Sequence, residues 1–272
     1  MIGEIYLPVD KIITYYGIDN SGAQMPGNFQ LLFLQWKASE IASAVEKYES
    51  SLPEGAWPNW MIGNHDRPRL ISRIGAAQTR IAAILLFTLR GTPTIYYGDE
   101  IGMRNVSIPD SEVQDPQGLN MPGKNLSRDP QRTPMQWNAS PNAGFTNGKP
   151  WLRLDEDFGN ENVESQLRDP DSILMLYKRL IATRQQEPSL SIGEYVAVYS
   201  DHQMLAYIRQ AKGHNRFLVV LNLSAEPCEF NPKNFPFKGI IVLATVTTME
   251  NIPVRDRLLL KANDGVVVRI EG

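Results

Sequence analysis

Three residues with chemically capable side chains stand together in this sequence: Asn64, His65 and Asp66. They follow a short apolar run that ends at Gly63, and they precede Pro68, after which apolar residues recur at helical spacing. The triplet is therefore predicted to lie where a strand passes into a helix. In barrels built of alternating strands and helices, catalytic groups gather at the carboxyl ends of the strands. This position favours a role in catalysis or ligand binding.

Asp66 also has a simpler interpretation as a helix cap. Aspartate is a favoured residue at helix N-termini, and Pro68 suits the first helical turn, where a missing N–H costs little. A capping role would explain Asp66 but neither Asn64 nor His65, since a helix cap requires neither. On the residues alone, both interpretations of Asp66 stay open.

A second carboxylate, Glu4, stands inside the apolar stretch of residues 1–7, which we expect to form a buried strand. A carboxylate inside an apolar strand is costly unless it is paired or has a function. The alternative is a solvated residue at the end of the strand. Further along, Arg128 and Arg132 lie in a long irregular segment, where they either anchor the loop through ion pairs or contact a ligand.

Composition narrows the class of protein. Of the 272 residues 42% are hydrophobic and 21% charged, as in soluble globular proteins, and the net charge is −3. The basic residues are scattered, which argues against nucleic acid as a partner. The single cysteine, Cys228, cannot form an internal disulfide and favours a reducing compartment. We find neither a secretory signal nor an apolar run long enough for a membrane, and we expect a cytoplasmic protein.

Strands and helices alternate in the first two-thirds of the chain, which is typical of a parallel sheet with right-handed crossovers. We expect strands at residues 1–7, 29–34, 60–62 and 94–97, and helices near residues 39–52, 67–90 and 172–185. A closed barrel of this kind needs eight strands, so four strands make half a barrel. Residues 101–171 form a long irregular loop, which is uncommon unless it serves a site.

After Pro188 the pattern changes from the helical period to period 2. We predict short strands at residues 194–199, 204–209, 216–223, 239–247, 257–260 and 265–270, with a hairpin turn at residues 263–265. The fold class is therefore α/β plus all-β. We expect residues 1–188 to form the half-barrel, with its loop at about 101–171, and residues 189–272 to form a small antiparallel β-sandwich.

Four segments together resemble the α-amylase family of glycoside hydrolases, in particular its α-glucosidase branch of maltases and oligo-1,6-glucosidases. These segments are residues 3–7 with 15–17, residues 64–66, residues 91–103 and residues 128–137. The resemblance covers essentially the whole chain. It implies the C-terminal half of a (β/α)8 TIM barrel, strands five to eight, followed by the family's antiparallel domain.

The resemblance also implies roles for individual residues. Glu4 matches the general acid/base at the end of the fifth barrel strand. Asp66 matches the carboxylate at the end of the seventh strand, which stabilises the oxocarbenium-like transition state. His65 matches a hydrogen-bond donor to the hydroxyls of the bound glucose unit, and Arg128 resembles the arginine that holds the terminal sugar. Asn64 and Arg132 are further candidates for substrate binding.

The implied reaction is retaining cleavage of terminal α-glucosidic bonds in small oligosaccharides or sucrose, which requires a proton donor and a carboxylate nucleophile. Glu4 can donate a proton only if an apolar setting or nearby negative charge raises its pKa. The family's nucleophile is an aspartate on the fourth strand, in a segment that this sequence does not contain, so we expect the isolated chain to be inactive. We expect no cofactor, and no metal, because the family's calcium loop belongs to the same missing segment.

The alternative is a non-catalytic or complementing half-barrel subunit. Open barrel edges invite pairing with another chain, either a separate amino-terminal half or a second copy. The presence of Glu4 and of residues 64–66 argues against a purely structural role. Kinship with the transporter-associated heavy subunits of the same superfamily ranks last, because those proteins are membrane-anchored and have lost catalytic residues.

Overall fold

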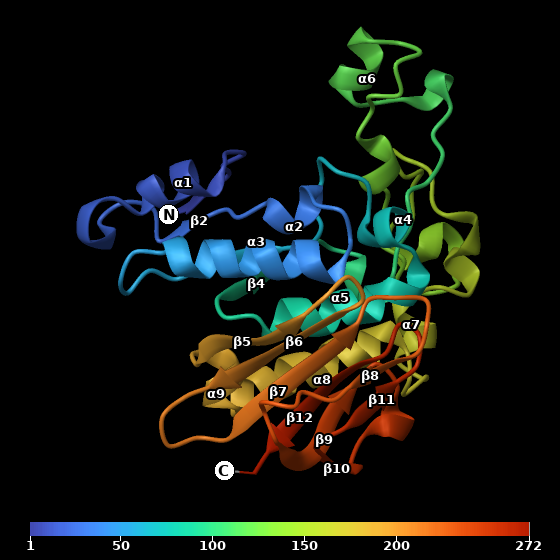
Figure 1. Ribbon diagram of the computed structural model, residues 1–272. Helices are drawn as coiled ribbons and strands as arrows, with labels where there is room; N and C mark the ends of the chain where they lie inside the picture. Colours follow the sequence, from blue (N-terminus) through green and yellow to red (C-terminus); the bar gives the residue numbers. More distant parts are fainter. Residues whose placement is uncertain (272) are drawn as a thin grey trace. The chain divides into compact units, whose positions relative to one another are not determined.

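The computed structural model describes residues 1–271 (Figure 1). The chain divides into two compact units. Unit 1 comprises Met1–Ile62, Arg80–Thr94 and Lys178–Gly272, and unit 2 comprises Gly63–Thr79 and Ile95–Tyr177. The helices are α1 (Val9–Ile12), α2 (Gln30–Phe33), α3 (Ala38–Ser51), α4 (Leu70–Ile74), α5 (Ala76–Thr88), α6 (Pro116–Asn120), α7 (Val163–Gln166), α8 (Ile173–Gln186) and α9 (Pro188–Ser191). The strands are β1 (Ile2–Gly3), β2 (Met25–Pro26), β3 (Asn59–Met61), β4 (Thr92–Thr94), β5 (Glu194–Ser200), β6 (Met204–Gln210), β7 (Arg216–Asn222), β8 (Cys228–Phe230), β9 (Lys238–Ala244), β10 (Pro253–Arg255), β11 (Leu258–Leu260) and β12 (Gly265–Ile270).

Two parallel strand pairs lie in unit 1. β1 pairs with β2, and β3 pairs with β4. The strand expected over residues 29–34 is wrong, because residues 30–33 form α2 and the second strand is β2. Leu31 and Leu32 are both buried. Two consecutive side chains can share one buried side in a helix, whereas in a strand they point to opposite faces.

β1 is shorter and more exposed than the strand expected over residues 1–7. Only Ile2 and Gly3 are in strand conformation, and Ile2 is 68% exposed. Among residues 1–271, β1 pairs with β2 alone, so one of its edges has no neighbouring strand. The expectation of a buried strand around Glu4 is therefore wrong.

Of the three helices expected in the first two-thirds of the chain, two are confirmed and one is wrong. α3 and α8 confirm the helices expected near residues 39–52 and 172–185. The single helix expected over residues 67–90 is wrong, since α4 ends at Ile74 and α5 begins at Ala76, with Gly75 between them. Gly75 has a φ of 81°, a conformation that glycine adopts without steric cost and that a right-handed helix cannot contain.

A six-stranded antiparallel sheet follows in unit 1, and it confirms the antiparallel β-structure expected there. Its strand order is β10-β9-β12-β7-β6-β5, and in Figure 1 it occupies the orange and red part of the ribbon. One face of the sheet, with Ile208, Val220 and Val268, packs against Phe230 of β8 and Leu258 of β11. β8 and β11 pair with each other, so they form a small second layer. The boundary expected between residues 188 and 189 stays a prediction, and α9 spans it.

The hairpin expected at residues 263–265 is wrong. The turn forms, with Asn263 at a φ of 60° and the Lys261 N–H donating to Asp264 Oδ2 at 2.9 Å. However, β11 pairs with β8, whereas β12 pairs with β7 and β9. The turn therefore carries the chain from one sheet to the other. Strands β8 and β10 are also absent from the sequence prediction.

Two buried arginines stabilise the carboxyl end of α5 within unit 1. Arg209 is fully buried and donates from Nη1 to the carbonyl oxygen of Thr88, and from Nη2 to that of Gly193 at 2.7 Å. The Arg184 guanidinium donates to further carbonyl oxygens, those of Phe87, Leu89 and Gly91. The last carbonyl groups of a helix have no partner inside the helix, and these arginines supply one.

In the described part of the chain, no helix is both long and apolar enough to cross a membrane.

Candidate functional site

The turn at residues 64–66 belongs to unit 2 and precedes α4. The side-chain oxygen of Asn64 accepts hydrogen bonds from the N–H groups of Asp66, at 3.1 Å, and Arg67, at 3.0 Å. Asn64 thus shapes the turn, a role that the sequence prediction of substrate binding did not include. α4 begins at Leu70, and its N-cap residue is Arg69. The interpretation of Asp66 as a helix cap is therefore wrong.

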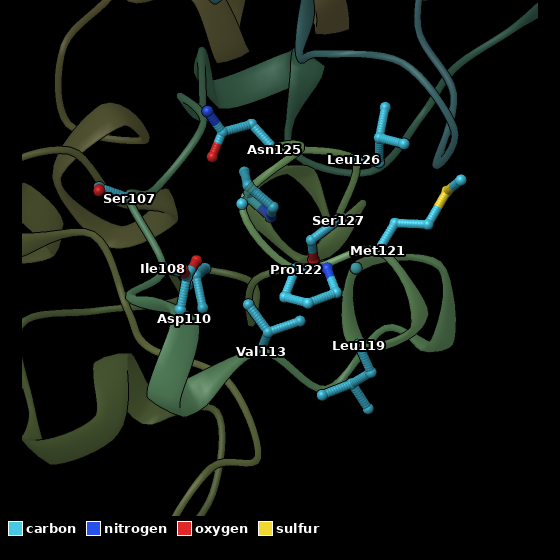
Figure 2. Close-up of a pocket in the computed structure, with 13 residues that line it drawn as sticks. Ser107, Ile108, Asp110, Val113, Leu119, Met121, Pro122, Asn125, Leu126 and Ser127 are labelled. Atoms are coloured by element: carbon cyan, nitrogen blue, oxygen red, sulfur yellow. The ribbon is translucent and has the colours of Figure 1, made fainter.

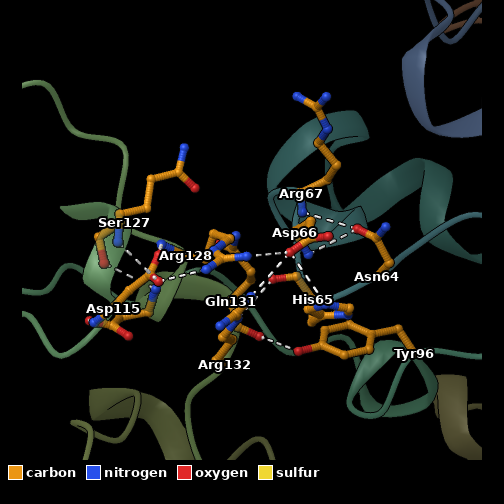
Figure 3. Close-up of polar contacts among 12 residues, drawn as sticks. Asn64, His65, Asp66, Arg67, Tyr96, Asp115, Ser127, Arg128, Gln131 and Arg132 are labelled. Atoms are coloured by element: carbon orange, nitrogen blue, oxygen red, sulfur yellow. Dashed lines mark hydrogen bonds and ion pairs between the residues drawn. The ribbon is translucent and has the colours of Figure 1, made fainter. Parts of the chain in front are cut away.

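Asp66 is the centre of a polar cluster (Figure 3). Its Oδ1 accepts hydrogen bonds from Arg128 Nη1 at 3.0 Å and Arg132 Nη2 at 3.1 Å, and it lies 3.3 Å from His65 Nε2. Arg132 also donates from Nε to the carbonyl oxygen of His65 at 3.0 Å. Five of the six predicted site residues, the three of the turn and the two arginines, are therefore brought together within unit 2.

The cluster keeps the Asp66 carboxyl ionised. Burial raises its pKa, but the hydrogen bond from Arg128 and the charges of His65, Arg128 and Arg132 outweigh burial, and the net effect lowers the pKa. A carboxylate whose pKa is lowered carries its negative charge at neutral pH. Because its side chain is still 24% exposed, Asp66 can attract a positive charge that develops on a ligand next to it.

Arg128 bridges two carboxylates. Its Nε and Nη2 donate to Asp115 Oδ2 and Oδ1 at 3.0 and 2.7 Å, while its Nη1 donates to Asp66. The side chain of Asp115 is fully buried, and the hydrogen bond from Arg128 holds the pKa of its carboxyl well below the usual range. Asp115 is absent from the sequence prediction. The available signal is the dipeptide Asp115–Pro116, which favours a turn but does not reveal a partner thirteen positions away.

Two tyrosines anchor the segment that carries the arginines. The Tyr96 hydroxyl donates to the carbonyl oxygen of Gln131 at 3.0 Å, and the Tyr97 hydroxyl donates to that of Thr133 at 2.7 Å. The strand expected over residues 94–97 is wrong at this point, because β4 ends at Thr94. Tyr96 and Tyr97 therefore lie outside the strand, and their hydroxyl groups bind the loop that carries the arginines.

A buried carboxylate, Asp99, packs against the residue that precedes the turn. A Cβ added to Gly63 would lie 2.3 Å from Asp99 Oδ2. Asp99 is 3% exposed, and in the described residues neither of its carboxylate oxygens has a hydrogen-bond partner. Burial raises the pKa of Asp99 to about 7, aided by the charge of Glu100 and opposed by those of Arg69 and Arg73. The backbone leading to the turn therefore rests on a carboxyl that titrates near neutral pH.

Glu4 is the sixth predicted residue and belongs to unit 1. It follows β1 directly, and its side chain is exposed. The apolar setting expected around it is absent from unit 1, so its role as a proton donor stays a prediction. Among residues 1–271, no group of three or more His, Cys, Asp or Glu side chains could hold a metal ion.

A cavity of about 250 Å³ lies within residues 107–130 of unit 2 (Figure 2). Its lining combines apolar and polar side chains, among them Ile108, Asp110, Val113, Leu126, Ser127 and Pro130. Ser127 and Pro130 flank Arg128 and Asp129 in the sequence, so the cavity borders the segment that carries Arg128. The long loop is thus partly folded on itself, and the sequence gives no sign of this cavity.

Comparisons with known proteins agree on one relationship. The family described as alpha amylase, catalytic domain, matches residues 1–193. Maltase A1 of Drosophila melanogaster is 38% identical over 83% of this chain and 40% of its own length. The amino acid transporter heavy chain SLC3A1 of Rattus norvegicus is 34% identical over 93% of this chain and 35% of its own length. The chain thus spans two-fifths or less of these two curated relatives.

Solved structures extend the likeness to the three-dimensional fold. The trehalulose synthase MutB of Pseudomonas mesoacidophila MX-45 superposes with a TM-score of 0.89 at 26% identity, covering 99% of this chain and 55% of that chain. Mutants of MutB have been solved with glucose and with isomaltulose. The chain therefore has the fold of a partial barrel domain followed by an antiparallel sheet.

Proposed function

This chain belongs to the α-amylase family, and from that premise we propose that it carries barrel strands five to eight of an α-glucosidase-type glycoside hydrolase. The reaction is retaining cleavage of terminal α-glucosidic bonds in small oligosaccharides or sucrose. In this proposal Glu4 protonates the leaving oxygen and Asp66 stabilises the positive charge of the transition state. The observation that carries the proposal is the convergence of His65, Arg128 and Arg132 on Asp66.

The roles of the other residues follow from their donors. His65 is 52% exposed, so its imidazole can donate a hydrogen bond to a hydroxyl of a bound glucose unit. Arg128 and Arg132 are partly exposed and offer further donors beside Asp66. That MutB mutants bind glucose and isomaltulose supports a glucosyl unit as the ligand.

The reaction also requires a carboxylate nucleophile on the opposite side of the sugar. The chain covers 55% of MutB, and the proposal assigns the nucleophile to the portion of the family fold outside these 272 residues. General acid catalysis by a residue such as Glu4 contributes on the order of 10²–10⁴ in rate. Without the nucleophile this contribution produces no turnover, so the isolated chain is expected to be inactive.

Release of p-nitrophenol from p-nitrophenyl α-D-glucoside tests the proposal. The chain alone should show no turnover, whereas a chimera with the amino-terminal half-barrel of Maltase A1 should hydrolyse the substrate. In the chimera, Glu4→Gln and Asp66→Asn should each lower kcat by about 10² or more. The control Asp110→Asn, which changes an exposed carboxylate of the long loop, should leave the rate unchanged. An active chimera that is indifferent to Asp66→Asn would contradict the proposal, as would normal turnover by the chain alone.

A second candidate function is a complementing subunit that pairs with another chain. Apolar side chains are exposed along the first part of unit 1, with Met1 at 84%, Ile2 at 68%, Ile18 at 83% and Phe33 at 51%. Apolar surface of this kind commonly marks an interface. Sedimentation velocity of the chain, alone and mixed with a separately made amino-terminal half-barrel, should reveal a homodimer or a one-to-one complex. A chain that stays monomeric in both experiments would exclude this function.

A further inference from the structure

We propose that Asp115 is a positioning residue that holds the Arg128 guanidinium in the orientation in which it reaches Asp66. The inference deepens the proposed function, and it rests on that function only for the identity of the ligand that Asp66 meets. It concerns three side chains of unit 2, all drawn in Figure 3. The long loop then contributes to the site through Asp115 as well as through the arginines.

The geometry of the guanidinium is the first argument. Arg128 uses one edge of its planar group, Nε and Nη2, for the two oxygens of Asp115, at 3.0 and 2.7 Å. Two parallel hydrogen bonds to one carboxylate fix the plane of a guanidinium and its rotation within that plane. The remaining nitrogen, Nη1, is then directed at Asp66, which it reaches at 3.0 Å. The direction of Nη1 is therefore set by Asp115.

The attachment of Asp115 itself is the second argument. Asp115 Oδ2 accepts the backbone N–H of Arg128 at 2.8 Å. In return, the adjacent Asp129 accepts the backbone N–H groups of Gln114, at 2.6 Å, and Asp115, at 3.0 Å, with its Oδ2. Each of the two segments, residues 114–115 and residues 128–129, thus donates backbone hydrogen bonds to a carboxylate of the other. Since Asp115 and Asp129 are both buried, the carboxylate that grips Arg128 is itself held in place.

A purely local role for Asp115 explains less of the geometry. Asp115 is the N-cap residue of α6, where its Oδ1 accepts the N–H of Gln117 at 3.4 Å. That distance is long for a hydrogen bond, whereas the contacts with Arg128 are short and charge-assisted, so they are the stronger ones. A capping residue also has no need of a guanidinium. The contacts of Asp115 are therefore directed mainly at Arg128.

The inference is tested by measuring the pKa of the Asp66 carboxyl in the 272-residue chain by ¹³C NMR. The Asp66 carboxyl signal is identified by its loss in the variant Asp66→Asn. The charged groups facing Asp66 are Arg128, Arg132 and His65. Asp115→Asn should release Arg128 from its orientation, so the pKa of Asp66 should rise by about 0.5 or more. Asp115→Glu, which keeps the charge but lengthens the side chain, should give a smaller rise. The matched control Asp110→Asn should give none.

The opposite results would overturn the inference. If the orientation of Arg128 did not depend on Asp115, then in Asp115→Asn the Nε and Nη2 groups of Arg128 would also be able to donate to Asp66. The pKa of Asp66 would then fall or stay unchanged. In a double-mutant cycle, Arg128→Lys should raise the pKa of Asp66, and adding Asp115→Asn should have no further effect. If Asp115→Asn does not fold by circular dichroism, Asp115→Glu decides in the same way.

The titration is independent of catalysis. Failure of the chimera to hydrolyse p-nitrophenyl α-D-glucoside would contradict the proposed function and leave the Asp66 titration intact. An unchanged pKa of Asp66 in both Asp115 variants would overturn the positioning role and leave the proposed function intact. The two proposals are therefore tested separately.

Discussion

Replacing Asp99 by asparagine is expected to change how the stability of the protein depends on pH. Asp99 is buried, and in the described chain neither of its carboxylate oxygens accepts a hydrogen bond. Its pKa is raised from 3.8 to about 7, chiefly by burial. The folded state therefore holds this proton more tightly than the unfolded state. The stability that the proton provides is complete below the unfolded pKa, and it is lost as the pH rises through the folded pKa.

The raised pKa gives the size of the effect. The interval between 3.8 and about 7 corresponds to on the order of 4 kcal/mol of unfolding free energy. Asparagine has nearly the same shape and does not titrate. The difference in unfolding free energy, wild type minus Asp99→Asn, should therefore fall by on the order of 4 kcal/mol between about pH 4 and about pH 8.

Urea denaturation of both proteins at a series of pH values measures this difference. Asp110→Asn, which removes an exposed carboxylate of the same unit, serves as the control and should show almost no dependence of the difference on pH. A difference that stays constant over the range would refute the reasoning. A difference that grows with pH would also refute it, because Arg69 and Arg73 would then hold the carboxylate ionised.

Two further substitutions test the packing. Gly63→Ala should lower the free energy of unfolding, measured by urea denaturation, by about 1–3 kcal/mol, because the added Cβ would lie 2.3 Å from Asp99 Oδ2. The loss should be smaller when Asp99→Ala is also present. An equal loss with and without Asp99→Ala would show that the added Cβ clashes with a different group. Arg209→Met removes the donors to the carbonyl oxygens of Thr88 and Gly193 and should cost about 2–5 kcal/mol by the same measurement. The exposed Arg168→Met should change the value by less than about 0.5 kcal/mol, and an equally small effect of Arg209→Met would contradict the helix-end role.

The sequence predicts the fold best where a pattern repeats over several turns or alternations. Helices α3 and α8 and strands β5, β6, β7 and β12 all lie where they are expected. The buried positions of α3 recur at helical spacing, and strands β6, β7 and β12 are apolar and buried along most of their length. Short elements fail for the opposite reason. Four residues from Gln30 to Phe33 are equally consistent with a strand or a helical turn, and only burial in the folded chain decides between them.

The candidate site is predictable to the extent that its parts are close in the sequence. The turn at residues 64–66 carries its own signal, and the family resemblance supplies Arg128 and Arg132. Asp115 and Asp99 have no such signal, since their importance depends on contacts with distant residues, a guanidinium in one case and Gly63 in the other. Contacts of this kind arise from tertiary structure, which local patterns do not encode.

The position of β12 has a consequence for how the protein folds during synthesis. β12 is the last strand of the sheet to be made, yet it lies between β9 and β7. Until it emerges from the ribosome, β7 and β9 each have a backbone edge with unsatisfied N–H and C=O groups. The nascent sheet is therefore exposed to pairing with other nascent chains, and conditions that slow translation of the residues of β12 should favour aggregation over folding.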